Sequence, residues 1–86
     1  MDVVKAKTIL ETKFPDYRIL NVRKFNNRYI FEALPPNASL DWDAYYAVDL
    51  KGNITYFSPV FVNNPADFLK LKPMVDYTNG ESDSYE

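Results

Sequence analysis

Cysteine and histidine are both absent from this chain of 86 residues. Without cysteine there is no disulfide and no thiolate nucleophile. Without histidine the chain lacks the side chain that most often acts as a general base, as a pH switch or as a zinc ligand. Hydrolysis by a zinc-bound hydroxide and serine–histidine relays are therefore excluded. We expect a protein that is not an enzyme and that carries no cofactor.

Long apolar runs are missing as well. The N-terminal stretch reads MDVVKAKTILETKF, in which Lys5, Lys7 and Glu11 interrupt the apolar residues. Such a stretch is neither a signal peptide nor a membrane-spanning segment. Unless a leader has been removed, we expect a cytoplasmic protein that does not associate with membranes.

The acidic charge is concentrated at the C-terminus. The net charge is −2, but residues 1–75 hold all ten Lys and Arg with eight of the twelve acidic residues, and residues 76–86 hold the other four acidic residues. This last segment, DYTNGESDSYE, is polar and poor in aliphatic side chains, so burial cannot offset the entropy of ordering it. We predict one α+β domain over residues 1–75 and a disordered acidic tail over residues 76–86.

The first fourteen residues predict an amphipathic helix of about three turns. Asp2 can cap its N-terminus by accepting a hydrogen bond from a free backbone N–H. Pro15 ends it, because a proline restricts the residue before it and cannot continue the hydrogen-bond ladder. The apolar side of this helix carries Val3, Ala6, Leu10 and Phe14.

Two runs of β-forming residues follow, YRILNVRKF and RYIFEAL, separated by Asn26 and Asn27. Asparagine tolerates positive φ, so this pattern predicts a tight hairpin with the two asparagines as its loop. Ile19 then lies on the mixed face of the hairpin, opposite the apolar face. The register implied by this loop pairs Phe25 with Arg28, Val22 with Phe31 and Leu20 with Ala33.

A second hairpin is predicted in the stretch YYAVDLKGNITYF, which carries four aromatic rings. Residues 50–52 form its loop, with Gly52 in the left-handed conformation. Tyr46 then faces Tyr56 on one side of the sheet, and Tyr45 and Phe57 lie on the other side. Since one helix covers only one face, the rings on the other face need a cover or a partner.

The expected fold class is α+β, with the N-terminal helix packed on a four-stranded antiparallel meander. A short C-terminal helix is predicted to begin at Asn64 and Pro65 and to end before Pro73, because proline is favoured at the first helical position and cannot continue a helix.

The stretch YYAVDLKGNITYF resembles the second half of PepSY-type domains, in which a strand ending in a Val-Asp-like pair turns through a glycine into another strand. The order of a helix followed by two hairpins is also similar to that family and to its cystatin-like relatives. The resemblance implies an α+β fold and a role in peptidase inhibition. The small size and acidic tail also resemble uncharacterised proteins encoded by bacterial phages and mobile elements.

Basic and aromatic side chains alternate in the first hairpin, with no acidic residue between positions 17 and 31. Cations beside stacking rings are typical of single-stranded nucleic-acid binding. The alternative is that the first strand is a sheet edge whose charges prevent it from pairing with other chains. The candidate nucleic-acid residues are Arg18, Arg23, Lys24, Arg28 and Tyr29.

The carboxylates Asp41, Asp43 and Asp49 flank Trp42 but lack the spacing and the glycine of a calcium loop, so no metal site is expected.

Residues 54–66 contain no charged side chain. As the last strand of a meander they would form a sheet edge, and an uncharged edge can pair with another chain. The alternative is that the protein covers this edge with its own polypeptide. The sequence therefore predicts an interaction module that self-assembles or binds a protein partner through its sheet. The candidate interface residues are Trp42, Tyr45, Tyr56, Phe57 and Phe61.

Overall fold

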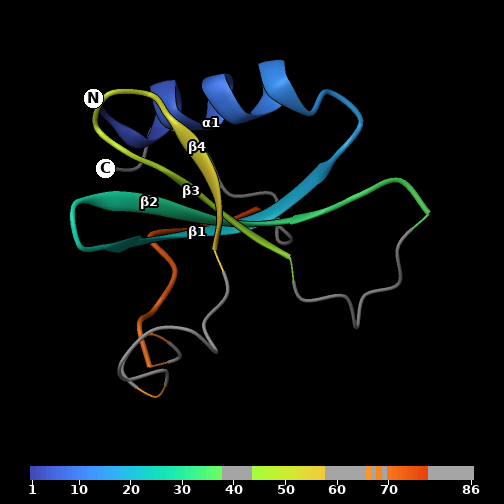
Figure 1. Cartoon of the computed structure of the whole chain (residues 1–86). Helices are drawn as coiled ribbons and strands as arrows, with labels where there is room; N and C mark the ends of the chain where they lie inside the picture. The colour runs from blue at the N-terminus through green and yellow to red at the C-terminus, as the bar shows by residue number, and fades with distance from the viewer. Residues whose placement is uncertain (38–43, 58–65, 67, 69, 78–86) are drawn as a thin grey trace.

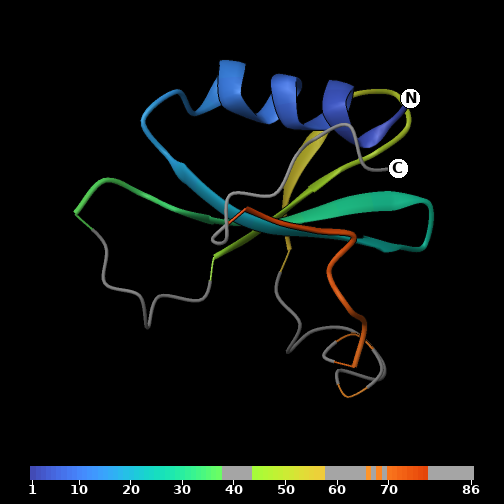
Figure 2. The same ribbon diagram turned by 180° about the vertical axis from the view of Figure 1, so that it is seen from behind.

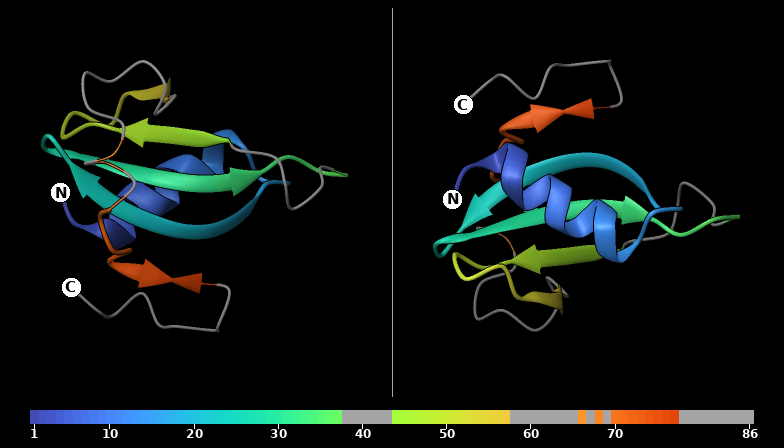
Figure 3. Two further views of the ribbon diagram at one scale, coloured as in Figure 1. Left: turned by 90° about the horizontal axis from the view of Figure 1, so that it is seen from below. Right: turned by 90° about the horizontal axis from the view of Figure 1, so that it is seen from above.

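The computed structural model describes residues 1–37, 44–57, 66, 68 and 70–77. One helix lies across one face of an antiparallel sheet whose strand order is β4-β3-β2-β1-β5, which confirms the α+β class (Figures 1 and 3). Within these described residues, no helix has the length and apolar character needed to cross a bilayer. The elements are α1 (Val3–Lys13), β1 (Arg18–Phe25), β2 (Arg28–Leu34), β3 (Tyr45–Val48), β4 (Ile54–Phe57) and β5 (Val75–Asp76).

Helix α1 forms as predicted. The Asp2 side chain accepts a hydrogen bond from the Lys5 N–H at 2.9 Å and caps the N-terminus. At the other end the Phe14 N–H donates to the Leu10 carbonyl at 2.9 Å, immediately before Pro15. The buried side chains of the helix are Val3, Ala6 and Leu10.

The first hairpin has the predicted loop but not the whole predicted register. Asn26 and Asn27 have φ of 51° and 61°, and the pairs of Phe25 with Arg28 and Val22 with Phe31 are confirmed. The pairing of Leu20 with Ala33 is wrong.

A β-bulge at Leu20 causes this difference, since Ala33 pairs with Ile19 and Glu32 pairs with Asn21. The extra residue reverses the alternation of side chains before it. Ile19 therefore packs into the cluster beneath α1, together with Tyr17, and the prediction that Ile19 lies on the opposite face is wrong.

The second hairpin is confirmed. Gly52 has φ of 88°, and its N–H donates to the Asp49 carbonyl at 3.0 Å. Tyr46 pairs with Tyr56, and Tyr45 pairs with Phe57 on the other face.

The Asp49 carboxylate organises the turn by accepting hydrogen bonds from the backbone N–H groups of Lys51 and Asn53, each at 2.9 Å. Hydrogen bonds from Asn53, and then from the turn backbone, hold the pKa of Asp49 below its ordinary value.

The sheet has five strands where four were predicted. Strand β5 pairs antiparallel with β1, joining Val75 to Val22 and Asp76 to Asn21. Asp76 therefore belongs to the sheet although it lies in the predicted tail, and residues 78–86 lie outside the described residues. A strand of two residues, Val75 and Asp76, is too short to produce a periodic pattern, which is why the sequence did not reveal it.

The predicted C-terminal helix is not confirmed. Among the described residues of this segment, the Lys70 N–H donates to the Ala66 carbonyl and the Leu71 N–H donates to the Phe68 carbonyl, each at 3.1 Å. Asn64 and Pro65 lie outside the described residues.

Two hydrophobic clusters lie on opposite faces of the sheet. The cluster beneath α1 is built around Val22, Phe31 and Val48. The cluster on the other face is covered by the segment that leads to β5, whose described part is drawn in orange in Figures 1 and 2. Its buried members are Ile30, Tyr45, Ala47, Phe57 and Phe68.

Candidate functional site

Strand β4 ends the sheet, and no residue in the described part of the chain pairs with its outer side. The other end of the sheet is β5, which is only two residues long and carries Asp76. Figure 3 shows both edges, with β4 in yellow and β5 in orange. Of these two edge strands β4 is the longer and the uncharged one, which agrees with the prediction for residues 54–57. Residues 58–65 of the predicted edge lie outside the described residues.

The pattern of hydrogen bonds between β3 and β4 determines which N–H and C=O groups of β4 point toward β3 and which point outward. The Asp49 N–H donates to the Asn53 carbonyl at 3.1 Å, which makes these residues a hydrogen-bonded pair. Hydrogen-bonded and non-hydrogen-bonded pairs alternate in an antiparallel ladder. Thr55 and Phe57 therefore direct their backbone groups toward β3, and Ile54 and Tyr56 direct theirs outward.

The side chains of β4 add apolar surface to these outward groups. Tyr56 is 64% exposed, which is the highest exposure among the large hydrophobic residues that the structure describes. Ile54 is half-buried and packs toward α1, and the Thr55 side chain is exposed on the opposite face. The edge therefore combines outward hydrogen-bonding groups, which no other described strand pairs with, and an exposed ring. Both are features of strands that pair with a partner.

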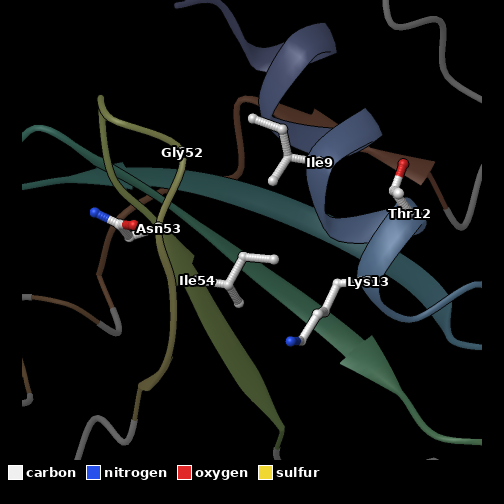
Figure 4. Close-up of a pocket in the computed structure, with 6 residues that line it drawn as sticks. All are labelled: Ile9, Thr12, Lys13, Gly52, Asn53 and Ile54. Atoms are coloured by element: carbon white, nitrogen blue, oxygen red, sulfur yellow. The ribbon is translucent and has the colours of Figure 1, made fainter.

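A cleft of about 440 Å³ lies next to this edge, between α1 and the turn before β4 (Figure 4). In the figure, Ile9 and Lys13 extend from the helix toward the hairpin, and Ile54 extends from the strand toward the helix. Lys13 is its one charged lining residue. The lining residues are Ile9, Thr12, Lys13, Gly52, Asn53 and Ile54.

A row of aromatic rings extends from β4 to the C-terminal end of α1. The Tyr46 ring centroid lies 5.8 Å from that of Tyr56, 5.1 Å from that of Phe14 and 5.9 Å from that of Tyr17. Burial, and then a hydrogen bond with Tyr17, raises the pKa of Tyr46 to about 12. The exposed ring of Tyr56 is therefore held in place by partly buried rings behind it.

Two of the predicted interface residues are not available at the surface. Tyr45 is 7% exposed and Phe57 is 6% exposed. Their rings contact Phe68, whose centroid lies 5.5 Å from that of Tyr45 and 5.0 Å from that of Phe57. The chain itself supplies the cover that these rings require, so their presence on the second face is no longer an argument for a partner. Trp42 and Phe61 lie outside the described residues.

Arg23 fixes the covering segment to the sheet. Its Nε donates to the Leu71 carbonyl at 3.0 Å, and its guanidinium donates to the Asn21 side chain at 3.1 Å. The same guanidinium carbon lies 5.6 Å from the ring centroid of Phe68. The sequence missed both roles, because no spacing relates Arg23 or Phe68 to the residues that they contact.

The structure does not assemble the predicted nucleic-acid surface. Tyr29 is 4% exposed and its hydroxyl donates a hydrogen bond to the Met1 carbonyl at 3.2 Å, so its ring cannot stack on a base.

The basic residues of the first hairpin are divided between the two faces of the sheet. Lys24 lies on the α1 face, whereas Arg23 and Arg28 lie on the other face, with the Arg28 guanidinium 5.8 Å from the Phe57 ring centroid. Arg18 is exposed near the start of β1. The alternative, a charged edge strand, is also wrong for the middle of β1, because β5 pairs there.

The acidic residues do not gather into a site. No group of three or more Asp or Glu side chains in metal-binding proximity is present among the described residues. Asp49 is used in its own turn, and Asp41 and Asp43 lie outside the described residues.

Comparison of the chain with protein-family models, with curated proteins and with solved structures finds no match. The resemblance to PepSY-type domains therefore stays a prediction.

Proposed function

We propose that this protein is a non-catalytic interaction module that binds an extended polypeptide strand along the outer edge of β4. The observation that carries the proposal is the outward direction of the Ile54 and Tyr56 backbone groups on an uncharged edge. An added strand would satisfy these groups with main-chain hydrogen bonds, and side-chain contacts would select the partner.

The contacts available at this edge set the expected strength of binding. Each main-chain hydrogen bond contributes about 1 kcal/mol net, because it replaces bonds to water. Two outward residues offer two donors and two acceptors, so the backbone alone gives weak binding. Contacts with the Tyr56 ring and with the cleft beside Ile54 must supply most of the specificity.

Two substitutions at position 56 test the proposal. Tyr56→Pro removes the outward N–H without breaking the bonds between β3 and β4, because proline is tolerated where its nitrogen faces solvent on an edge strand. Tyr56→Thr is the matched control, since it also removes the ring but keeps the N–H. We expect Tyr56→Thr to bind the captured partner more weakly than wild type does, because the ring is lost. We expect Tyr56→Pro to bind it at least about tenfold more weakly than Tyr56→Thr, a further loss of about 1.4 kcal/mol.

The partner is to be identified by mass spectrometry and then titrated in purified form against each variant by calorimetry. Thermal unfolding of the two variants shows whether both are folded. Equal affinity of the partner for folded Tyr56→Pro and Tyr56→Thr would contradict pairing along the edge, and so would the absence of any partner or self-association for the wild type.

A further inference from the structure

We infer that the strand accepted by β4 is β4 of a second copy of this chain, paired antiparallel about a two-fold axis at Thr55. This inference rests on the proposed function and names the partner. It follows from the symmetry of the edge, because a two-fold interface requires each copy to present the same self-complementary surface.

The backbone of β4 has this self-complementarity. The outward residues Ile54 and Tyr56 lie on either side of Thr55, whose own backbone groups face β3. With the axis at Thr55, Ile54 of each copy forms a hydrogen-bonded pair with Tyr56 of the other, which gives four main-chain bonds. An axis at Ile54 or at Tyr56 leaves only one such pair within the bounds of β4, so the register centred on Thr55 is preferred.

The side chains support the same register. Ile54 and Tyr56 both lie on the α1 face of the sheet, so each Tyr56 ring would meet Ile54 of the other copy. Directly opposed aromatic and β-branched side chains are stabilising cross-strand pairs. The arrangement places the exposed ring of one copy beside the mouth of the cleft of the other, which Ile54 helps to line.

Charge also favours a second copy at this edge. Symmetric pairing brings identical residues close together, and like charges opposite each other destabilise a sheet. Strand β4 reads ITYF and has no charge to repel its own copy, whereas the same operation at β5 would bring Asp76 near its equivalent. Because the strand has only four residues, the expected contact is small and the association weak, as in transient complexes.

The absence of cysteine from the chain makes a cross-linking test direct. In the inferred register Thr55 faces Thr55 of the other copy in a non-hydrogen-bonded pair, with Cα atoms about 4.5 Å apart. A disulfide spans Cα atoms about 4.4 to 6.8 Å apart, so Thr55→Cys can form one across the axis. Thr8→Cys is the control, because Thr8 is also exposed but lies on α1.

The 86-residue Thr55→Cys and Thr8→Cys chains are oxidised at the same concentration, and the disulfide dimer is followed by non-reducing electrophoresis. We expect Thr55→Cys to cross-link at least about tenfold faster, and we expect Tyr56→Pro added to Thr55→Cys to remove this advantage. Sedimentation equilibrium of the wild type is expected to show a reversible monomer–dimer equilibrium.

Equal cross-linking rates of the two cysteine variants, together with a wild type that stays monomeric to about 1 mM, would overturn the inference. Faster cross-linking of Tyr56→Cys than of Thr55→Cys would overturn the register. If self-pairing fails but a different protein binds Tyr56→Thr and not Tyr56→Pro, the proposed function stands without this inference. If neither form of pairing is found, both fall.

Discussion

Tyr46 connects the exposed ring of Tyr56 on β4 with the aromatic rings that follow α1. Its ring lies between Tyr56 on β4 and Phe14 and Tyr17 beyond α1. Its side chain is partly buried and its hydroxyl is hydrogen-bonded with Tyr17, which favours the neutral phenol over the phenolate. The sequence showed that Tyr46 would face Tyr56, but the contact with Tyr17 arises from the path of the chain after Pro15.

This environment predicts an alkaline loss of stability. The pKa of Tyr46 is raised from 10.0 to about 12 on folding, so its contribution is complete below pH 10 and is lost as the pH rises toward 12. Unfolding by urea at several pH values should show a steeper decline above pH 10 in wild type than in Tyr46→Phe. Tyr56→Phe removes only the smallest of the effects that raise the pKa of Tyr46, so its decline should stay closer to that of wild type than to that of Tyr46→Phe. Equal declines in wild type and Tyr46→Phe would contradict this explanation.

Gly52 has a role that follows from both the sequence and the structure. The turn requires a φ of 88°, which other residues adopt at a cost of roughly 1 kcal/mol. The structure adds that this turn lies against the helix, since a Cβ at position 52 would make van der Waals contact, at 3.4 Å, with the Cδ1 atom of Ile9. The turn thus packs against α1, and no reading of the local pattern could reveal that contact.

At the scale of single elements, the sequence was most informative about helix ends and tight turns. Asp2, Asn26 and Gly52 act through their own backbone or that of residues a few positions away. The bulge at Leu20 was missed, because its reason lies in the packing of Ile19 and Tyr17 beneath α1. Neighbouring residues determine a cap or a turn. The position of this bulge instead depends on how the side chains pack beneath α1, which the local sequence does not reveal.

The N-cap gives a prediction at the scale of the helix. Asp2→Ala removes the acceptor for the Lys5 N–H and should lower the free energy of unfolding by about 1 kcal/mol. Asp2→Ser keeps an oxygen acceptor and should recover most of this stability. Urea denaturation of the three proteins measures the difference, and an Asp2→Ala protein as stable as wild type would show that the cap contributes little.

At the scale of the whole molecule, the second face of the sheet depends on residues far away in the sequence. Phe68 is fully buried against Tyr45, Phe57 and Phe25. Arg23 on β1 holds the neighbouring backbone through the Leu71 carbonyl. These contacts make Phe68, with Leu71 packed beside it, part of the core on this face. They leave the edge of β4, not a face of the sheet, as the candidate interface.

Phe68→Ala tests this dependence. Removing a buried phenylalanine typically costs about 3 to 5 kcal/mol, a large part of the 5 to 15 kcal/mol that stabilises a small domain. We expect a much lower melting temperature and increased binding of a hydrophobic dye, because Tyr45 and Phe57 lose their cover. Lys70→Ala, at an exposed position of the same segment, should change stability by no more than about 0.5 kcal/mol. A Phe68→Ala protein as stable as Lys70→Ala would contradict the proposed role of this cover.

The sequence by itself determined the helix, the two hairpins and an uncharged edge at β4, because caps, turn residues and side-chain alternation act over a few neighbouring positions. Only the tertiary structure decided which rings are covered, where β5 pairs, that Tyr29 is buried and that Arg23 holds the covering segment. Those outcomes depend on contacts between residues far apart in the sequence, such as that of Arg23 with Leu71. No local sequence pattern predicts such contacts. Among the residues that the structure describes, the exposed ring of Tyr56 lies on the strand whose backbone groups point outward, and we propose that a partner binds there.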